Sequence, residues 1–354
     1  MPVVISSIGL ATPALYVTQE EAYASLIEHF SMGESEKALY RRVLLGSDAI
    51  DGRYIGMDEK SEVANLDQDQ LIERFARHGR KIAAEASRNA ISQAKIEVET
   101  ITGLIVNTCT GYLCPGMTSH LVEDLGLSAR VKIRDLVGMG CGGALPNLDT
   151  AVGMISRSPQ DIVLCVSYEI CTATLFMGPD PDLVISNCIF ADGAGASVLR
   201  FKDDQEGLPE EMHYLDFETG IYPEYRKDLH YRTEQHRLRN VLSRRVPVIA
   251  AEKAEEVLNR LLVRNKLGRN DIDHWVMHPG GTQVLEKVQQ RLELPPNAFW
   301  ASHEIFRRYG NMSSPSVLFI LREIIDIKQP KSGEKAVLLA FGAGFSVFAT
   351  LIEF

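Results

Sequence analysis

Residues 138–143, with the sequence GMGCGG, join a strand-like run at 131–137 to an amphipathic stretch at 144–157. Glycine adopts backbone conformations that other residues avoid, so this segment lets the chain turn sharply between a strand and a helix. A strand, a tight turn and a helix in succession are typical of α/β folds. Cys141 lies within the turn, where the N–H groups of the following helix favour a thiolate over a thiol. Cys141 is therefore a candidate nucleophile.

The same segment supports two other interpretations. Gly138, Gly140 and Gly143 also fit the G-x-G-x-x-G pattern of dinucleotide-binding loops. Glu169 follows the next strand-like run, where such a fold keeps its ribose-binding acid. A cysteine at this place can also be a small apolar residue of the core. The motif alone thus leaves three readings open: a nucleophile, an NAD(P)-dependent oxidoreductase and a structural cysteine.

The composition narrows the class of protein. With 354 residues, 45% of them hydrophobic, the chain is long enough for two domains or one large two-part fold. Its net charge of −10 disfavours binding to a phosphate backbone, so nucleic acid is not an expected partner. No stretch reaches membrane-spanning length, and the apolar run at 2–10 reads as a first strand and not as a signal peptide. We expect a cytoplasmic protein with no membrane partner.

The cysteines give no sign of a disulfide framework or a metal site. They are Cys109, Cys114, Cys141, Cys165, Cys171 and Cys188. Without a secretory signal they are expected to be reduced thiols. Their spacing, and the scatter of the nine histidines, matches no common metal-ligand pattern. We therefore expect no structural metal.

Two kinds of periodicity alternate along the chain. Helical periodicity is found at 19–30, 67–94, 248–267, 282–292 and 314–327, and buried strand-like runs at 101–106, 162–166, 274–277 and 336–340. The polar segment at 201–211 divides the chain roughly in half. On each side a long helix leads to a buried strand and a glycine loop, at 90–111 and 261–281. The sequence predicts an α/β fold with a duplicated unit.

Two further polar residues follow predicted core elements. His278 ends a strand and precedes Gly280 and Gly281, at a position that faces a crevice in an open α/β fold. Asn311 lies in a glycine turn that opens a helix, and its side chain offers donors and an acceptor without titrating. A histidine can also be a satisfied core or surface residue, and Asn311 can be a helix cap.

The order and spacing of five short motifs resemble the type III polyketide synthases, the chalcone and stilbene synthase family. The motifs are GC at 140–141, GP at 178–179, FADGA at 190–194, HPGG at 278–281 and GNMSS at 310–314. The resemblance implies a thiolase-like fold with a duplicated, five-layered αβαβα architecture that works as a homodimer. Residues 1–205 would form the half with the nucleophilic cysteine, and residues 206–354 the half with the histidine and asparagine.

The resemblance also implies roles for individual residues. Cys141 would carry the growing acyl chain, and His278 and Asn311 would polarise the malonyl thioester. The substrate-binding residues would be Phe190 as gatekeeper of the cavity, Thr174 and Ser313 as cavity-lining residues, Cys114 as a residue that reaches into the partner subunit's cavity, and Gly280 and Gly281. Four basic residues lie near where the family binds the phosphates of coenzyme A, or else form a solvated helix face: Lys37, Arg41, Arg42 and Arg53.

The chemistry of such a reaction agrees with these residue types. A protonated His278 would hold Cys141 as a thiolate that attacks an acyl-CoA starter. Decarboxylation of malonyl-CoA leaves an enolate, which needs hydrogen-bond donors but no metal or redox cofactor. Asn311 suits this task because a carboxylate would repel the enolate.

The choice of starter is the least constrained feature. The segment at 238–247 has no second aromatic gatekeeper, small residues follow Cys141, and Ala343 stands where the family usually has a proline. We expect a roomier cavity, a fatty acyl-CoA starter and a pyrone or resorcinol product. The alternatives are another thiolase-fold condensing enzyme, the oxidoreductase named above, and a non-catalytic acyl-CoA-binding scaffold.

Overall fold

The computed structural model describes residues 3–202 and 211–354, and its centre is a nine-stranded mixed sheet. From one edge to the other the strands are β11 (His274–Met277), β12 (Lys335–Gly342), β13 (Ser346–Glu353), β8 (Met212–Ile221), β1 (Val3–Ala11), β7 (Asp192–Phe201), β6 (Val163–Ile170), β4 (Gly103–Thr108) and β5 (Lys132–Val137). Only three residue pairs, from Val3 with Tyr214 to Ile5 with Met212, join β1 to β8. The sheet therefore consists of two halves with a narrow connection.

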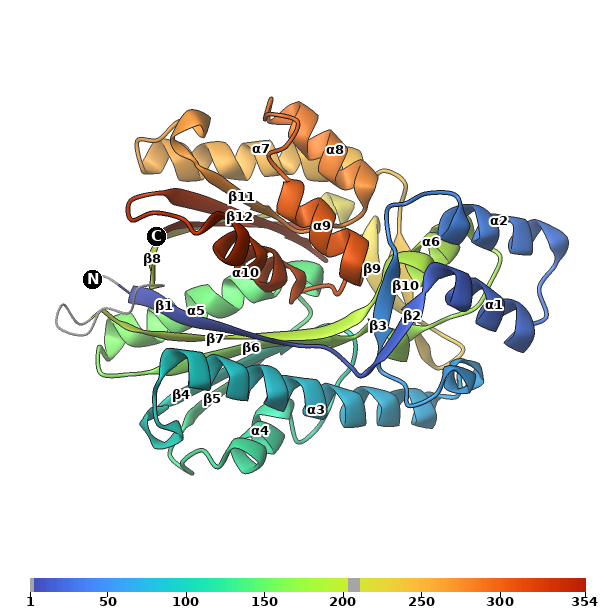
Figure 1. The fold of residues 1–354 in the computed structure, drawn as a ribbon, viewed down its shortest axis with the longest axis horizontal. Coiled ribbons are helices and arrows are strands. Elements are labelled where there is room, and N and C mark those ends of the chain that lie inside the picture. The colour runs from blue at the N-terminus through green and yellow to red at the C-terminus, as the bar shows by residue number, and fades with distance from the viewer. Residues whose placement is uncertain (1–2, 203–210) are drawn as a thin grey trace.

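Helices form three layers around these two halves (Figure 1). The outer layers are α3 (Gln68–Ala94) and α4 (Met117–Leu125) on one side, and α7 (Val246–Arg264) and α8 (Thr282–Arg291) on the other. The middle layer is α5 (Ala144–Arg157) and α10 (Ser316–Lys328). This arrangement confirms the duplicated, five-layered αβαβα architecture predicted from the sequence.

The middle layer forms the core between the two halves of the sheet. Leu148 of α5 and Leu318 of α10 are buried there, together with Ile105 of β4 and Leu338 of β12. Each such side chain contributes about 1.5–3 kcal/mol when it leaves water. Two further apolar clusters hold α3 and α7 on the outer faces. The core thus fixes both halves of the sheet relative to each other.

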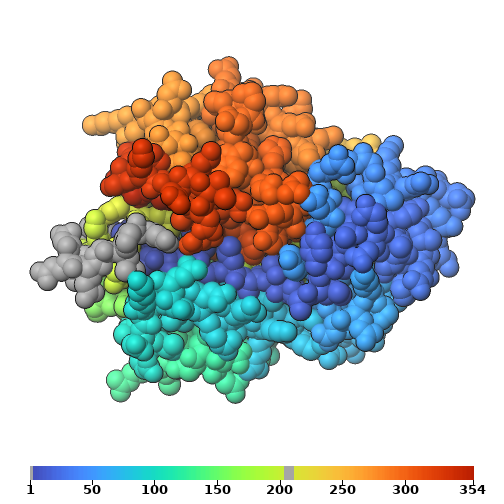
Figure 2. All heavy atoms as spheres, in the orientation of Figure 1, coloured from blue at the N-terminus to red at the C-terminus, as the bar shows by residue number. Residues whose placement is uncertain are grey.

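The remaining elements gather at one end of the layered body, on the right in Figure 1. They are α1 (Gln19–His29), α2 (Glu34–Leu45), α6 (Pro181–Ile189), the pair β2 (Leu15–Thr18) with β3 (Gly52–Ile55), and the hairpin β9 (Leu229–Glu234) with β10 (Arg237–Leu242). Helix α9 (Trp300–Tyr309) lies between this end and α10. Asp51 and Arg307 form an ion pair where α9 meets β3. Figure 2 shows the N-terminal elements α1, α2, β2 and β3, in blue, against the C-terminal helices in orange.

The predicted helices and strands are all present, with ends that differ by a few residues. The helix expected to begin at 314 begins at Ser316, after Pro315. Local periodicity did not reveal α2, α4, α6, α9 or the β9–β10 hairpin. The predicted boundary at 201–211 lies largely on residues 203–210, outside the described residues, so the division after residue 205 stays a prediction. No helix in residues 3–202 and 211–354 is long and apolar enough to cross a bilayer.

Candidate active site

Cys141 lies in a single 3-10 turn, Gly140–Gly142, between β5 and α5. Gly140 has a φ of 62°, and a Cβ there would lie 2.6 Å from the main-chain nitrogen of Ala343. The turn that follows β12 therefore packs directly against the turn that holds the cysteine. Glycine is required here both for the backbone conformation and for the close approach. The two halves of the protein meet at the sulfur-bearing segment.

His278 follows β11 and is 98% buried, with an exposed fraction of 2%. Its main-chain N–H donates to the carbonyl of Leu339 at 2.8 Å, which extends the pairing of β11 with β12. The ring nitrogen Nδ1 is buried and has no hydrogen-bond partner in the described part of the chain. The sheet therefore fixes the main chain of His278, and no described side chain binds Nδ1.

Asn311 forms a short bridge with Phe190, where the two halves again meet. Its N–H donates to Ile189 and its carbonyl accepts from Ala191, both at 2.8 Å. Its side-chain Oδ1 accepts from the N–H of Ser313 at 2.8 Å. That contact engages the acceptor end of the amide and leaves the NH2 group for a ligand. The helix-cap interpretation is wrong, because Pro315 is the N-cap of α10 and that helix has no side-chain cap.

One small pocket brings these side chains together. Cys141, His278 and Asn311 line it together with Phe190 and Gly280. The other lining residues are apolar: Leu229, Leu242, Val246, Val284 and Phe341. The three residues predicted to be catalytic, which are far apart in the sequence, thus share one largely apolar pocket. We call it the catalytic pocket.

The surroundings of the pocket disfavour isolated charges. Burial raises the pKa of the Cys141 thiol to about 12, although a hydrogen bond with Ser313 lowers it in part. Burial also lowers the pKa of His278 to about 3. The N-terminus of α5 therefore does not by itself give the thiolate expected from the sequence. A thiolate and an imidazolium formed together attract each other strongly in such surroundings, so we expect ionisation of Cys141 to depend on pairing with His278.

Glu169 lies behind the pocket and is completely buried. Its carboxylate accepts hydrogen bonds from the main chain of Cys109, from the hydroxyl and main chain of Thr110, and from the hydroxyls of Thr108 and Ser314. Burial raises the pKa of this carboxyl. A carboxylate enclosed in this way cannot hold a ribose, so the dinucleotide interpretation of the glycine motif is wrong.

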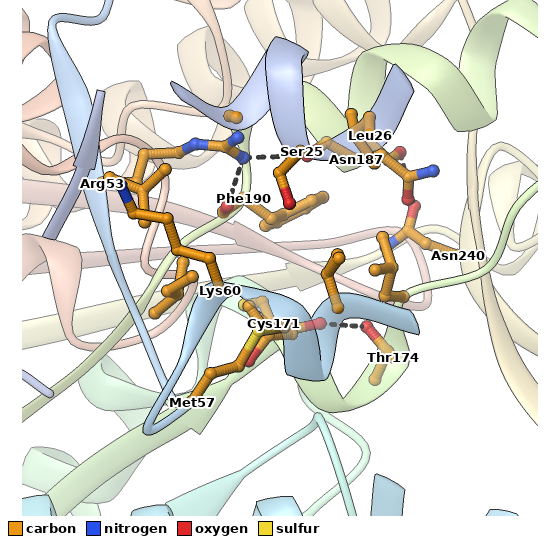
Figure 3. Close-up of a pocket in the computed structure, with 17 residues that line it drawn as sticks. Ser25, Leu26, Arg53, Met57, Lys60, Cys171, Thr174, Asn187, Phe190 and Asn240 are labelled. Atoms are coloured by element: carbon orange, nitrogen blue, oxygen red, sulfur yellow. Dashed lines mark hydrogen bonds between the residues drawn. The ribbon is translucent and has the colours of Figure 1, made fainter. Parts of the chain in front are cut away.

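Two of the predicted cavity residues line a second space, larger than the catalytic pocket (Figure 3). Thr174 and Phe190 lie on its wall, and Phe190 also lines the catalytic pocket. We call this space the α1 cavity; its other walls include Ala22, Ser25 and Leu26 of α1, Arg53, Lys60 and Asn240. Ser313 is buried beside Cys109, with 3.4 Å between Oγ and Sγ. Cys114 is exposed and lines neither space.

The structure separates the four basic residues predicted to bind coenzyme A. Arg42 lines a third cavity, which also includes Gly280 and Gly281 and therefore borders the catalytic pocket. We call it the mouth cavity. Arg244, which sequence reasoning missed, lines it too. Lys37 and Arg41 do not line it, and Lys37 pairs with Glu34 on the surface of α2.

The prediction for Arg53 is wrong. The residue has an exposed fraction of only 7%, and its guanidinium donates to the carbonyls of Asn187 at 2.8 Å and Phe190 at 2.9 Å. These carbonyls belong to the C-terminal end of α6, where a cation is favoured by the helix dipole. Arg53 is thus turned into the α1 cavity and cannot reach a phosphate at the surface.

Sequence reasoning also missed Tyr231 on the β9–β10 hairpin. Its hydroxyl lies 3.5 Å from the hydroxyl of Thr174, and burial raises the pKa of Tyr231 well above its usual value. Leu229 and Leu242 of the same hairpin line the catalytic pocket. The alternation of Leu229, Tyr231 and Thr233 is a period-two signal that could have revealed this strand.

Comparisons with known proteins cover nearly the whole chain. The family described as FAE1/Type III polyketide synthase-like protein matches residues 17–214, and the family described as chalcone and stilbene synthases, C-terminal domain, matches residues 217–353. The chain is 26% identical to a 3,5-dihydroxyphenylacetyl-CoA synthase from Amycolatopsis balhimycina, over 98% of this chain and 92% of the relative. It is also 26% identical to an alpha-pyrone synthesis polyketide synthase-like protein from Mycobacterium tuberculosis, over 99% and 91%.

Solved structures show the same fold. PKS-I from the brown alga Ectocarpus siliculosus superposes with a TM-score of 0.91 at 23% identity, over 99% of this chain and 98% of that chain. A fungal type III polyketide synthase, ORAS, gives a TM-score of 0.88 at 24% identity and covers both chains completely. These similarities confirm the thiolase-like fold.

Proposed function

Because the chain belongs to the chalcone and stilbene synthase family of type III polyketide synthases, which are acyltransferases, we propose that it extends an acyl-CoA starter with malonyl-CoA and then cyclises the product. The observation that carries this proposal is the meeting of Cys141, His278 and Asn311 in one pocket. A nucleophile, a proton acceptor and an amide donor are the groups that such a reaction needs.

The first step transfers the starter to the enzyme. As Cys141 gives its proton to His278, the sulfur attacks the thioester carbonyl of the acyl-CoA, and the coenzyme A thiolate leaves. The leaving thiolate takes the proton from His278, so the enzyme returns to a neutral imidazole and carries the acyl group on Cys141. The largely apolar lining of the pocket excludes water that would hydrolyse this thioester.

The second step decarboxylates malonyl-CoA and forms the new carbon–carbon bond. As carbon dioxide leaves, the thioester oxygen gains negative charge and accepts hydrogen bonds from the NH2 group of Asn311 and an N–H of His278. The low pKa of His278 keeps the imidazole neutral at neutral pH, and a neutral imidazole still has one N–H donor. The carbanion then attacks the thioester on Cys141 and releases its thiolate. Repetition of both steps lengthens the chain before cyclisation.

The mouth cavity provides the entrance for both coenzyme A thioesters. Arg42 and Arg244 stand at its wall, and coenzyme A carries phosphates that arginine binds well. The reaction needs no metal or redox cofactor, because hydrogen-bond donors supply the charge stabilisation. We further propose a homodimer in which the exposed Cys114 approaches the partner subunit's cavity.

We propose a fatty acyl-CoA as the starter and a pyrone or resorcinol as the product. The α1 cavity supports this choice, since it adds largely apolar space next to Phe190. Asn240, from the segment that lacks an aromatic gatekeeper, lines the same cavity. The alternatives from the sequence are another condensing enzyme of this fold and a non-catalytic acyl-CoA-binding scaffold.

Radiolabelled malonyl-CoA and a panel of acyl-CoAs from acetyl to palmitoyl test the proposal. We expect carbon dioxide release and a labelled polyketide product with at least one starter, and neither with Cys141→Ala. Tight acyl-CoA binding without either signal would favour the scaffold. Condensation with acetyl-CoA as the extender, without carbon dioxide release, would favour another condensing enzyme.

A further inference from the structure

The α1 cavity carries an unusual set of charges for a hydrocarbon-binding space. Arg53 and Lys60 line it, and none of its described lining residues is an aspartate or glutamate. Lys60 is paired with Glu21 of α1 at 2.5 Å. Arg53 is buried and donates to the two carbonyls of α6. No direct ion pair joins it to a described carboxylate, and the buried Asp192 acts on it only through a longer-range electrostatic attraction. A buried guanidinium without a direct carboxylate partner makes the cavity favourable for an anion or another oxygen acceptor.

Ser25 provides a second, independent signal in the same cavity. Its Oγ is buried and has no hydrogen-bond partner among residues 3–202 and 211–354. Figure 3 shows this hydroxyl directed from α1 into the cavity, toward the ring of Phe190. A buried hydroxyl without a partner is costly, so such groups in native proteins are satisfied by protein, water or ligand. An acceptor oxygen on a ligand would satisfy this one.

The rest of the wall is suited to an aliphatic chain. Apolar surface comes from α1, β2, β3 and the segment that follows β3, through Val17, Leu26, Ile55, Met57 and Val63. The cavity therefore combines a hydrocarbon-binding wall with a few oxygen-binding groups.

We propose that the α1 cavity binds the distal end of the starter's acyl chain and selects a chain that ends in a carboxylate over a methyl-ended chain of equal length. Phe190 is the wall shared with the catalytic pocket, so rotation of its ring opens the way from Cys141 into the cavity. Ser25 donates to the carboxylate, and Arg53 supplies the positive charge. This inference rests on the proposed function and names the substrate class of that same site.

Loading of Cys141 by two starters of equal length tests the selection. Octanoyl-CoA and suberoyl-CoA both have eight-carbon acyl groups, and only suberoyl-CoA ends in a carboxylate. Intact-protein mass spectrometry measures the rate of acyl transfer to Cys141 without malonyl-CoA. We expect suberoyl-CoA to load about tenfold faster at limiting concentration, which is the usual effect of one hydrogen bond to a charged group. Ser25→Ala should remove most of this preference. Arg53 is not substituted in this experiment, because its hydrogen bonds also hold α6.

A pair of substitutions on α1 tests whether the cavity is used at all. Ala22→Leu places a larger side chain in the cavity, and Ala24→Leu places the same side chain on the exposed face of the same helix. We expect Ala22→Leu to slow loading of both eight-carbon starters at least about fivefold, because the added branch occupies their space. Acetyl-CoA should load normally in both variants, and Ala24→Leu should behave as wild type.

The outcomes separate this inference from the proposed function. Equal or faster loading of octanoyl-CoA by the wild type, or an unchanged preference in Ser25→Ala, would overturn the selection for a carboxylate. Normal loading of both eight-carbon starters by Ala22→Leu would show that the chain lies elsewhere. In each case acetyl-CoA would still load and malonyl-CoA would still release carbon dioxide. Loss of those two signals from the wild type would instead overturn the proposed function.

Discussion

Replacement of Asn311 by aspartate changes the chemistry of the pocket with little change in shape. The main chain of Asn311 is held by Ile189 and Ala191, each at 2.8 Å, and these bonds do not depend on the side chain. The oxygen that accepts from the N–H of Ser313 is also retained in aspartate. The substitution therefore replaces only the NH2 donor by an acceptor. We expect Asn311→Asp to fold as wild type and to lose decarboxylation.

The size of the loss follows from two contributions. Removal of one donor to a developing oxyanion costs about 100- to 1,000-fold in rate, or about 3–4 kcal/mol. A carboxylate at roughly 4 Å from the enolate adds a repulsion of about 4 kcal/mol at an effective dielectric constant of about 20. The sum, about 7 kcal/mol, corresponds to roughly 10⁵-fold. Asn311→Ala loses only the first contribution, so the order of activity is wild type, Asn311→Ala, Asn311→Asp.

Two assays on the same variants distinguish this role from a structural one. Release of labelled carbon dioxide from malonyl-CoA measures decarboxylation, and mass spectrometry measures loading of the starter on Cys141. Both Asn311 variants should load the starter at close to the wild-type rate. An Asn311→Asp variant that decarboxylates as fast as Asn311→Ala, or variants that fail to load the starter, would refute the assignment of Asn311 to the enolate.

Cys141→Ala should abolish starter loading and iodoacetamide labelling of the pocket, whereas Cys165→Ala, at a buried site on β6, should keep both. His278→Ala should slow alkylation of Cys141 at neutral pH by at least about tenfold, because burial alone then holds the thiol pKa at about 12. The alkylation rate of this variant should keep rising as the pH is raised toward that pKa. A pH profile equal to that of the wild type would contradict the role of His278. Arg42→Ala and Arg244→Ala should each raise KM for malonyl-CoA several-fold with little change in kcat, since each removes one phosphate contact; a loss confined to kcat would argue against the mouth cavity as the coenzyme A site.

The sequence predicted those parts of the site that depend on local pattern. The turn that holds Cys141 could be read from glycines between a strand-like and a helical run, and His278 could be read from its place after a buried strand. Asn311 was predicted from a short motif, and the same residue could also be interpreted as a helix cap. The residue type alone therefore does not determine its role. Only the fold shows that Asn311 is paired with Phe190, 121 positions earlier in the chain.

Contacts between distant segments account for the errors. Arg53 belongs to a basic stretch that suggests phosphate binding, but its partners are carbonyls 134 and 137 residues away. Glu169 stands at the correct distance for a ribose-binding acid, yet its acceptors are occupied by residues of β4 and of the segment before α10. Neither set of hydrogen bonds can be predicted from sequence periodicity. The spacing of apolar residues shows which face of a helix or strand is buried, but not which distant residue a polar side chain binds.

In the proposed reaction, the hydrogen bonds around Phe190 link the choice of starter to decarboxylation. The carbonyl of Phe190 accepts from Arg53 at 2.9 Å, and its neighbours Ile189 and Ala191 hold the main chain of Asn311. Phe190, which lines both the α1 cavity and the catalytic pocket, is thus part of the same hydrogen-bonded unit as Asn311, the proposed donor to the enolate. A shift of this backbone would move the wall of the starter site and the Asn311 amide together. Ser25 lies on α1, outside this unit, whereas Arg53 belongs to it, so we expect the proposed carboxylate to act on the unit through Arg53 and not through Ser25.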